Sequence, residues 1–214
     1  MLVANLIMRP RYPKVRSASK PSLRSILSDP PYIFFVGAGV FVMLGLFYPV
    51  FYLQLYSIKR GIPQKIAFDT ISFINAGGVI GRLIPNFLAG HIGSFNVITP
   101  VTFLAASCIL VMLANLNSAG IVAISLLYGG LNAAFVSMTP AVLADLSSNR
   151  SEIGLRMGLW FTITAAAALA GQPLSGMLIH SDFRWSTVFA GVCMFMGGCI
   201  LILSRYHLLK KLRT

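Results

Sequence analysis

Apolar residues fill six long stretches of the chain, and polar or charged residues collect between these stretches and at both ends. Positions 83 to 144, a run of 62 residues, contain no Asp, Glu, Lys or Arg. Apolar segments of about 18 residues or more are typical of transmembrane helices, because that length crosses the hydrocarbon core of a bilayer. The pattern therefore predicts an all-α polytopic membrane protein with six spans, at about Tyr32–Tyr56, Ile66–Gly90, Val97–Leu116, Ala119–Leu143, Met157–Ile179 and Ser186–Ser204.

The composition supports this fold class. Of the 214 residues, 57% are hydrophobic and only 10% are charged, whereas a soluble domain carries about 25% charged residues. The chain is therefore expected to be an integral membrane protein with a six-helix transmembrane domain over residues 32–205. The first seven residues are apolar and run abruptly into a basic segment, so residues 1–31 are interpreted as the end of an earlier helix plus a basic cytoplasmic linker. Residues 206–214 form a basic cytoplasmic tail.

The basic residues predict an orientation. A net charge of +12 could indicate a protein that binds nucleic acid. However, the Lys and Arg residues lie mainly between spans and at the chain ends, where they can contact anionic lipid headgroups. Membrane lipid is thus an expected partner and nucleic acid is not. The two ends and the loop between the fourth and fifth spans hold 12 Lys and Arg, against four in the opposite loops. The positive-inside rule places both termini in the cytoplasm, so the sequon at Asn149 is expected to carry no glycan.

Arg82 lies deep in the second span. A charged side chain at that depth costs roughly 2.5–3.5 kcal/mol on insertion scales, and it normally faces the interior of a bundle or a water-filled cavity. Asn75 is seven residues earlier and shares a helix face with Arg82, with Gly78 between them and Asn86 beyond. We interpret this stripe as a candidate solute-binding surface. The alternative is a structural arginine that bonds the backbone carbonyls of a neighbouring helix.

Other polar residues within spans are weaker candidates. Tyr52 and Ser137 are the two that we add to the candidate solute site, although each could equally form an interhelical hydrogen bond. The same alternatives apply to Tyr48, Gln54, Asn132 and Gln172. The five carboxylates all lie in flanks, loops or span ends, so no buried acidic pair is expected. No motif of a soluble enzyme, a metal site or a cofactor site is found, and we predict that the chain is not an enzyme and binds no cofactor.

Three stretches resemble the major facilitator superfamily and, within it, the fungal monocarboxylate-transporter-like group. Residues 75–93 resemble the eighth helix of that family and the loop after it, with Gly90 and His91 in place of an acidic and a basic residue. Residues 140–146, followed by 153–158 and 171–176, resemble the tenth and eleventh helices. Arg82 then matches the arginine that the family uses for the substrate carboxylate. Gly78 stands where animal-type members carry an aspartate, so an Asp–Arg pair for proton coupling is not supported.

The resemblance implies a function. The chain would be the C-terminal half of a twelve-helix transporter that moves a small organic solute, a monocarboxylate or a related anion, by alternating access across the plasma membrane. Its partner would be a missing N-terminal six-helix half, or a second copy in a homo-oligomer. The alternative is a truncated membrane protein that does not transport, and that is inert or modulates a full-length transporter.

Overall fold

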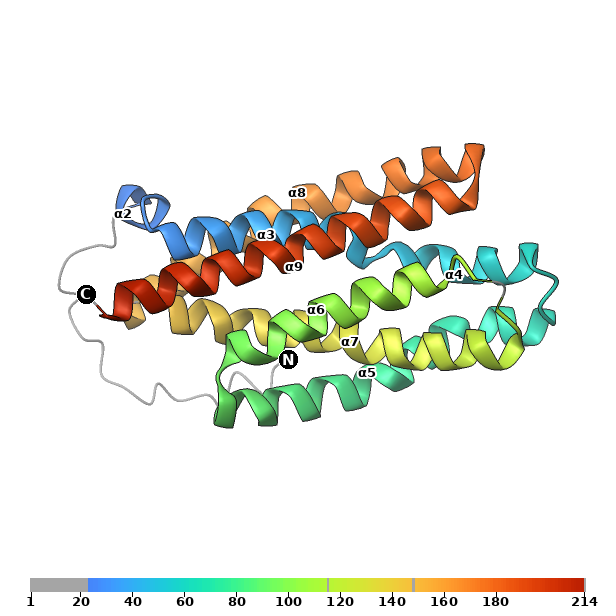
Figure 1. Cartoon of the computed structure of the whole chain (residues 1–214), viewed down its shortest axis with the longest axis horizontal. Helices are drawn as coiled ribbons and strands as arrows, with labels where there is room; N and C mark the ends of the chain where they lie inside the picture. Colours follow the sequence, from blue (N-terminus) through green and yellow to red (C-terminus); the bar gives the residue numbers. More distant parts are fainter. Residues whose placement is uncertain (1–22, 115, 148, 214) are drawn as a thin grey trace, which may run out of the picture.

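The computed structural model describes residues 23–114, 116–147 and 149–213. They form helices that lie side by side along one long axis (Figure 1). Six helical stretches of this described part are long and apolar enough to cross a membrane, which confirms the predicted all-α, six-span fold. The helices are α2 (Leu23–Leu27), α3 (Pro30–Leu46), α4 (Tyr48–Lys59), α5 (Gln64–Ile92), α6 (Ser94–Val111), α7 (Ser118–Leu146), α8 (Arg150–Ser181) and α9 (Phe183–Arg213).

The first span is broken in its middle. Helix α3 ends at Leu46, Phe47 separates it from α4, and Pro49 occupies the first turn of α4, where a missing N–H disrupts no helical hydrogen bond. The hydroxyl of Tyr128, on α7, donates to the carbonyl oxygen of Leu46 beside the break. A backbone group freed within a membrane needs such a partner, because the hydrocarbon offers none. By contrast, Pro85, Pro140 and Pro173 lie inside continuous helices.

Helices α5 and α7 approach each other most closely through glycines. Gly77 and Gly81 on α5 face the backbone carbonyls of Leu126 and Gly130, and Gly129 on α7 faces the carbonyl of Ile74. A Cβ at Gly77, Gly81 or Gly129 would lie closer to those oxygens than van der Waals contact allows. Small residues bring helices together in lipid, where no hydrophobic effect drives association. This packing fixes the orientation of α5, and therefore of Arg82.

The ends of two expected segments differ from the sequence-based boundaries. The short helix α2 lies within the stretch expected to be a linker, and its Ile26 is buried. Helix α9 continues to Arg213, past the boundary expected at residue 205. The expected end of an earlier helix and most of the basic linker fall in residues 1–22, outside the described residues.

Two spans are much less covered than the others. In the most apolar windows of α5 and α8, 17% and 22% of residues are buried, whereas the other four spans bury between 44% and 56%. Figure 1 shows α5 along one edge of the bundle and α8 toward the opposite edge. The described helices therefore leave one face of each of these two spans without a protein neighbour.

Candidate functional site

The polar stripe predicted on the second span lies on α5. Asn75, Arg82 and Asn86 are all exposed, and Gly78 contacts α7 through the side chain of Ala133. Arg82 forms no ion pair with any described residue. The structure thus leaves the guanidinium of Arg82 on the sparsely covered face of α5 and within the length of a membrane span.

Ser137 joins this stripe through Asn86. The Asn86 side-chain nitrogen lies 2.6 Å from the carbonyl oxygen of Arg82, to which it donates, and 3.0 Å from Ser137 Oγ on α7. Ser137 Oγ in turn donates to the carbonyl oxygen of Ala134 at 3.2 Å. We call Asn75, Arg82, Asn86 and Ser137 the arginine face. The side chain of Asn86 connects the two helices there, a role that the spacing of residues on one helix does not reveal.

Tyr52 lies in a different place, between α4 and α8. Its hydroxyl donates to the carbonyl oxygen of Gln172 at 3.0 Å, and Gly176 leaves room for that hydroxyl. The side-chain nitrogen and oxygen of Gln172 are both buried, and neither has a hydrogen-bond partner among the described residues. An unpartnered buried amide costs free energy, so this α4–α8 seam offers polar atoms to a water or a solute. Of these residues, the sequence interpretation favoured Tyr52 over Gln172.

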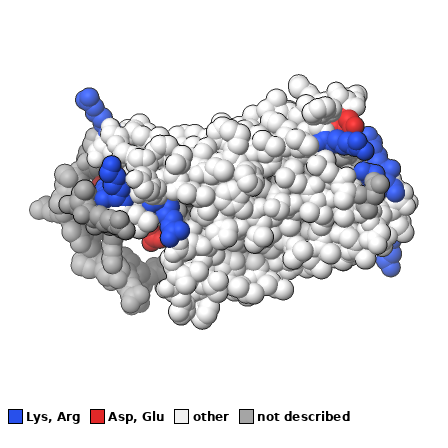
Figure 2. Space-filling model, viewed as in Figure 1, with Lys and Arg blue, Asp and Glu red and all other residues white. Residues whose placement is uncertain are grey.

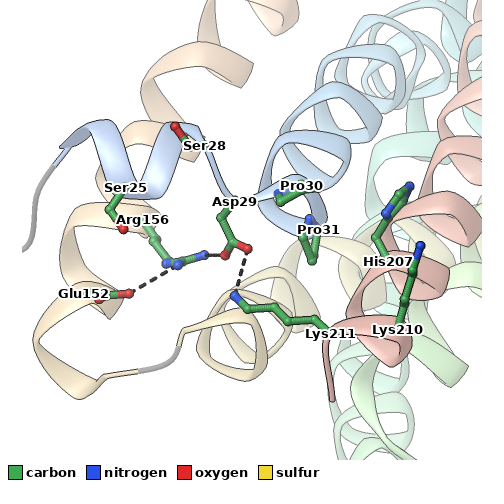
Figure 3. A pocket seen from close by; sticks show the side chains of 10 residues that line it. All are labelled: Ser25, Ser28, Asp29, Pro30, Pro31, Glu152, Arg156, His207, Lys210 and Lys211. Carbon is green, nitrogen blue, oxygen red and sulfur yellow. Dashed lines mark hydrogen bonds and ion pairs between the residues drawn. The ribbon is translucent and has the colours of Figure 1, made fainter. Parts of the chain in front are cut away.

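A buried ion pair was not anticipated from the sequence. Arg156 on α8 is 3% exposed, and its guanidinium lies 2.7 Å from the carboxylate of Asp29, which is 7% exposed (Figure 3). Glu152 lies 3.2 Å from Arg156, and Lys211 lies 2.9 Å from Asp29. Asp29 lies in a span flank, as expected, and its pairing with Arg156 was not identified from the sequence.

This cluster ties together the start of α3, the first turns of α8 and the end of α9. The Tyr32 hydroxyl donates to the backbone oxygen of Arg156 at 2.9 Å, and the Arg156 guanidinium lies 5.2 Å from the centre of the Tyr32 ring. A cavity of about 640 Å³ adjoins the cluster and includes His207 in its lining. Asp29 and Arg156 thus pair with each other and with Lys211 and Glu152, whereas the buried Arg156 Nε has no hydrogen-bond partner among the described residues.

The described residues contain no group of three or more His, Cys, Asp or Glu side chains that could hold a metal ion. The candidate residues form two separate groups: the arginine face, with one exposed cation, two amides and one hydroxyl, and the α4–α8 seam, with the Tyr52 hydroxyl and the buried amide of Gln172. Such an arrangement can bind an organic anion by charge and hydrogen bonds, and it contains no nucleophile paired with a base for catalysis.

No protein-family model matches the chain, but several curated proteins are similar to it in sequence. The chain is 32% identical to the MFS-type transporter dbaD of Emericella nidulans over 185 residues, which are 84% of this chain and 42% of that protein. It is 32% identical to the MFS-type transporter hasB of Aspergillus fumigatus over 220 residues, covering 92% and 49%. It is 30% identical to the aspyridones efflux protein apdF of Emericella nidulans over 171 residues, covering 79% and 35%.

Six apolar spans define a polytopic membrane protein. The chain belongs to the major facilitator superfamily. It spans about half the length of the curated relatives it matches. Their names, all of transporters or efflux proteins, agree with the prediction that the chain is not an enzyme.

Proposed function

We propose that the chain forms one half of an alternating-access transporter for small organic anions, with Arg82 as the residue that binds the anionic group. The observation that carries this proposal is the position of Arg82, exposed on the least covered span and without an ion-pair partner among the described residues. A guanidinium facing lipid there would cost roughly 2.5–3.5 kcal/mol or more. This cost supports our proposal that the exposed face of α5 borders a water-filled cavity.

The open faces of α5 and α8 support a second body of six helices as the partner. The relatives are about twice as long as this chain, so they have room for a second body of this size. Facilitator-type transporters bind their solutes between two halves. That body is the preceding part of a longer chain or a second copy of this one. The Tyr52–Gln172 seam and the arginine face would then line one cavity, with Asn75 donating a hydrogen bond to the anion that Arg82 holds.

The solute that we propose is a monocarboxylate or a related organic acid. This choice agrees with the monocarboxylate-transporter-like resemblance and with the single cation of the arginine face, which has no ion-pair partner among the described residues. Two relatives are named as efflux proteins, for aspyridones and for agnestins, and these names support outward transport. We place both termini in the cytoplasm on the basis of the basic flanks, and the protein in the plasma membrane on the basis of the family resemblance.

Release of a trapped anion from liposomes tests the proposal. Liposomes that contain the purified chain would be loaded with radiolabelled benzoate or lactate, and release would be compared for wild type, Arg82→Gln, Arg82→Lys and Lys65→Gln. Lys65 is an exposed cation at the start of the same helix, away from the arginine face, and is the matched control. A charge-assisted hydrogen bond contributes about 1.5–3 kcal/mol, so Arg82→Gln should slow release at least about tenfold and Lys65→Gln should not.

Two results would count against the proposal. Equal release from wild type and Arg82→Gln would remove the role of Arg82. No release from any variant, together with light scattering that shows two copies of the chain in each particle, would exclude a second copy as the partner half and favour the non-transporting alternative.

A further inference from the structure

A second cluster of cations lies at the membrane end opposite the Asp29–Arg156 pair, where α4 and α8 end and α9 begins. Figure 2 shows Lys and Arg gathered at both ends of the molecule, with a white surface between them. At the α4 end, a cavity of about 380 Å³ is hollowed between the three helices, which is within the usual size range of small-ligand pockets. Its lining consists of Tyr56, Lys59, Arg60, Ile179, His180, Ser181, Asp182 and Phe183. We call this cavity the vestibule.

Aromatic rings hold two of the vestibule cations in place. The Lys59 ammonium lies 4.9 Å from the centre of the Phe183 ring, and the Arg60 guanidinium lies 5.3 Å from the centre of the Tyr56 ring. The two rings meet edge to face at 6.0 Å, and the Tyr56 hydroxyl donates to the carbonyl oxygen of Ala114 at 2.8 Å. Contact with these rings favours the positions of the two cations beside the cavity, which reduces the cost of ordering them when an anion binds.

The charge balance of the vestibule favours anions. Asp182 is the carboxylate of its lining, and its Oδ1 accepts the backbone N–H of Arg184 at 3.0 Å, as a residue preceding the first turn of a helix commonly does. The positive end of α9 therefore offsets part of that charge. Arg184 itself lines an adjoining cavity of about 50 Å³, together with Arg60 and Asp182. Three cations thus surround the two cavities, against one carboxylate that already caps a helix.

The vestibule lies about one helical turn from the Tyr52–Gln172 seam along the same two helices. Tyr52 and Tyr56 are one turn apart on α4, and Gln172, Gly176 and Ile179 follow one face of α8. Apolar and aromatic side chains, Tyr56, Ile179 and Phe183, form much of its lining. A ligand that suits this surface has an anionic group for Lys59 and Arg60 and an apolar body for the rings.

We propose that the vestibule is a binding site for organic carboxylates, at which solutes collect at one mouth of the transport path. The proposal deepens the proposed function and rests on it for the role in transport, whereas the binding itself can be measured separately. Fixed cations at the mouth of a path raise the local concentration of anions, and the effect falls with ionic strength.

Benzoate labelled with ¹³C at the carboxyl carbon is the probe. Its binding to the full chain in nanodiscs of zwitterionic lipid would be measured by NMR line broadening, with benzyl alcohol as the neutral control. Lys59→Gln and Arg60→Gln should each raise the Kd for benzoate at least fivefold, and their double variant further. Lys65→Gln removes one cation near the same membrane end but outside the vestibule lining, and should leave the Kd unchanged. Circular dichroism would verify equal helix content.

Three outcomes would overturn the vestibule proposal: unchanged benzoate binding in the Lys59 and Arg60 variants, equal binding of benzyl alcohol, or loss of benzoate binding when anionic lipid is added to the nanodiscs. The last would show that the cations bind a lipid headgroup. Binding that is lost only in Arg82→Gln would place the probe on the arginine face and leave the proposed function standing. Vestibule binding without release from liposomes whose particles hold two copies of the chain would count against the second-copy form of the proposed function and leave the vestibule proposal standing.

Discussion

Separating Asp29 from Arg156 should destabilise the bundle by several kcal/mol. Removing one partner of a buried ion pair costs about 3–5 kcal/mol, because the other charge stays buried and unpaired. Here each charge keeps a second partner, since Glu152 lies 3.2 Å from Arg156 and Lys211 lies 2.9 Å from Asp29. We therefore expect the lower end of that range, about 3 kcal/mol, for Asp29→Ala and for Arg156→Met.

The double variant, Asp29→Ala with Arg156→Met, tests whether the two residues stabilise the bundle as a pair or independently. When both charges are replaced by apolar groups, neither is left without a partner, so the combined cost should be smaller than the sum of the single costs by about 2 kcal/mol or more. Lys211→Gln should cost less than about 1 kcal/mol, because the Lys211 side chain is 46% exposed and water screens its charge.

Trp160 supplies the readout for this prediction. It lies one turn after Arg156, is fully buried and stacks on Phe35 at 5.8 Å, so its fluorescence should report loss of packing near the ion pair. Unfolding would be followed in detergent micelles as the SDS fraction rises. Asp145→Asn, a change at an exposed carboxylate near the end of α7, is the control and should stay within about 0.5 kcal/mol of wild type. Single variants as stable as this control, or costs that simply add in the double variant, would refute the reasoning.

Two further predictions concern packing and topology. Gly81→Val should abolish folding or cost at least about 3 kcal/mol in the same SDS titration, because its Cβ would overlap the carbonyl of Gly130, whereas Gly154→Ala, with open space around it, should be neutral or slightly stabilising. Asn149 should remain without a glycan when the chain is expressed in yeast, since its loop is expected to face the cytoplasm. A glycosidase-sensitive mass shift that Asn149→Gln removes would reverse the orientation.

The six spans could be predicted because the length of an apolar segment is a local property. The break in the first span could not be predicted, because the sequence alone does not distinguish Pro49 from the other prolines within spans. Pro49 follows a helix end, whereas Pro85 lies within a continuous helix. Whether a helix stops near a proline depends on which neighbours satisfy the freed backbone groups, and the Tyr128 hydroxyl that binds the Leu46 carbonyl is 82 positions away.

The candidate site was predictable to the extent that it lies on one helix. Asn75 and Arg82 share a face because helix geometry requires it. Helix periodicity does not say which neighbouring helix a polar group meets, so it could not show that Asn86 joins Arg82 to Ser137, or that Tyr52 bonds to Gln172 instead. The Asp29–Arg156 pair joins residues 127 positions apart, and each residue alone resembles an ordinary charged flank of a span.

The contrast between two arginines is the strongest physical argument for where a solute binds. Arg156 is 3% exposed and meets two carboxylates, so its charge is neutralised within the bundle and has no need of a ligand. Arg82 lies on an exposed face of a span and has no carboxylate partner among the described residues. Both guanidiniums carry the same permanent charge, which must be balanced wherever water is scarce. The protein balances the charge of Arg156 itself, and we propose that the charge of Arg82 is balanced by a solute in the space beside α5.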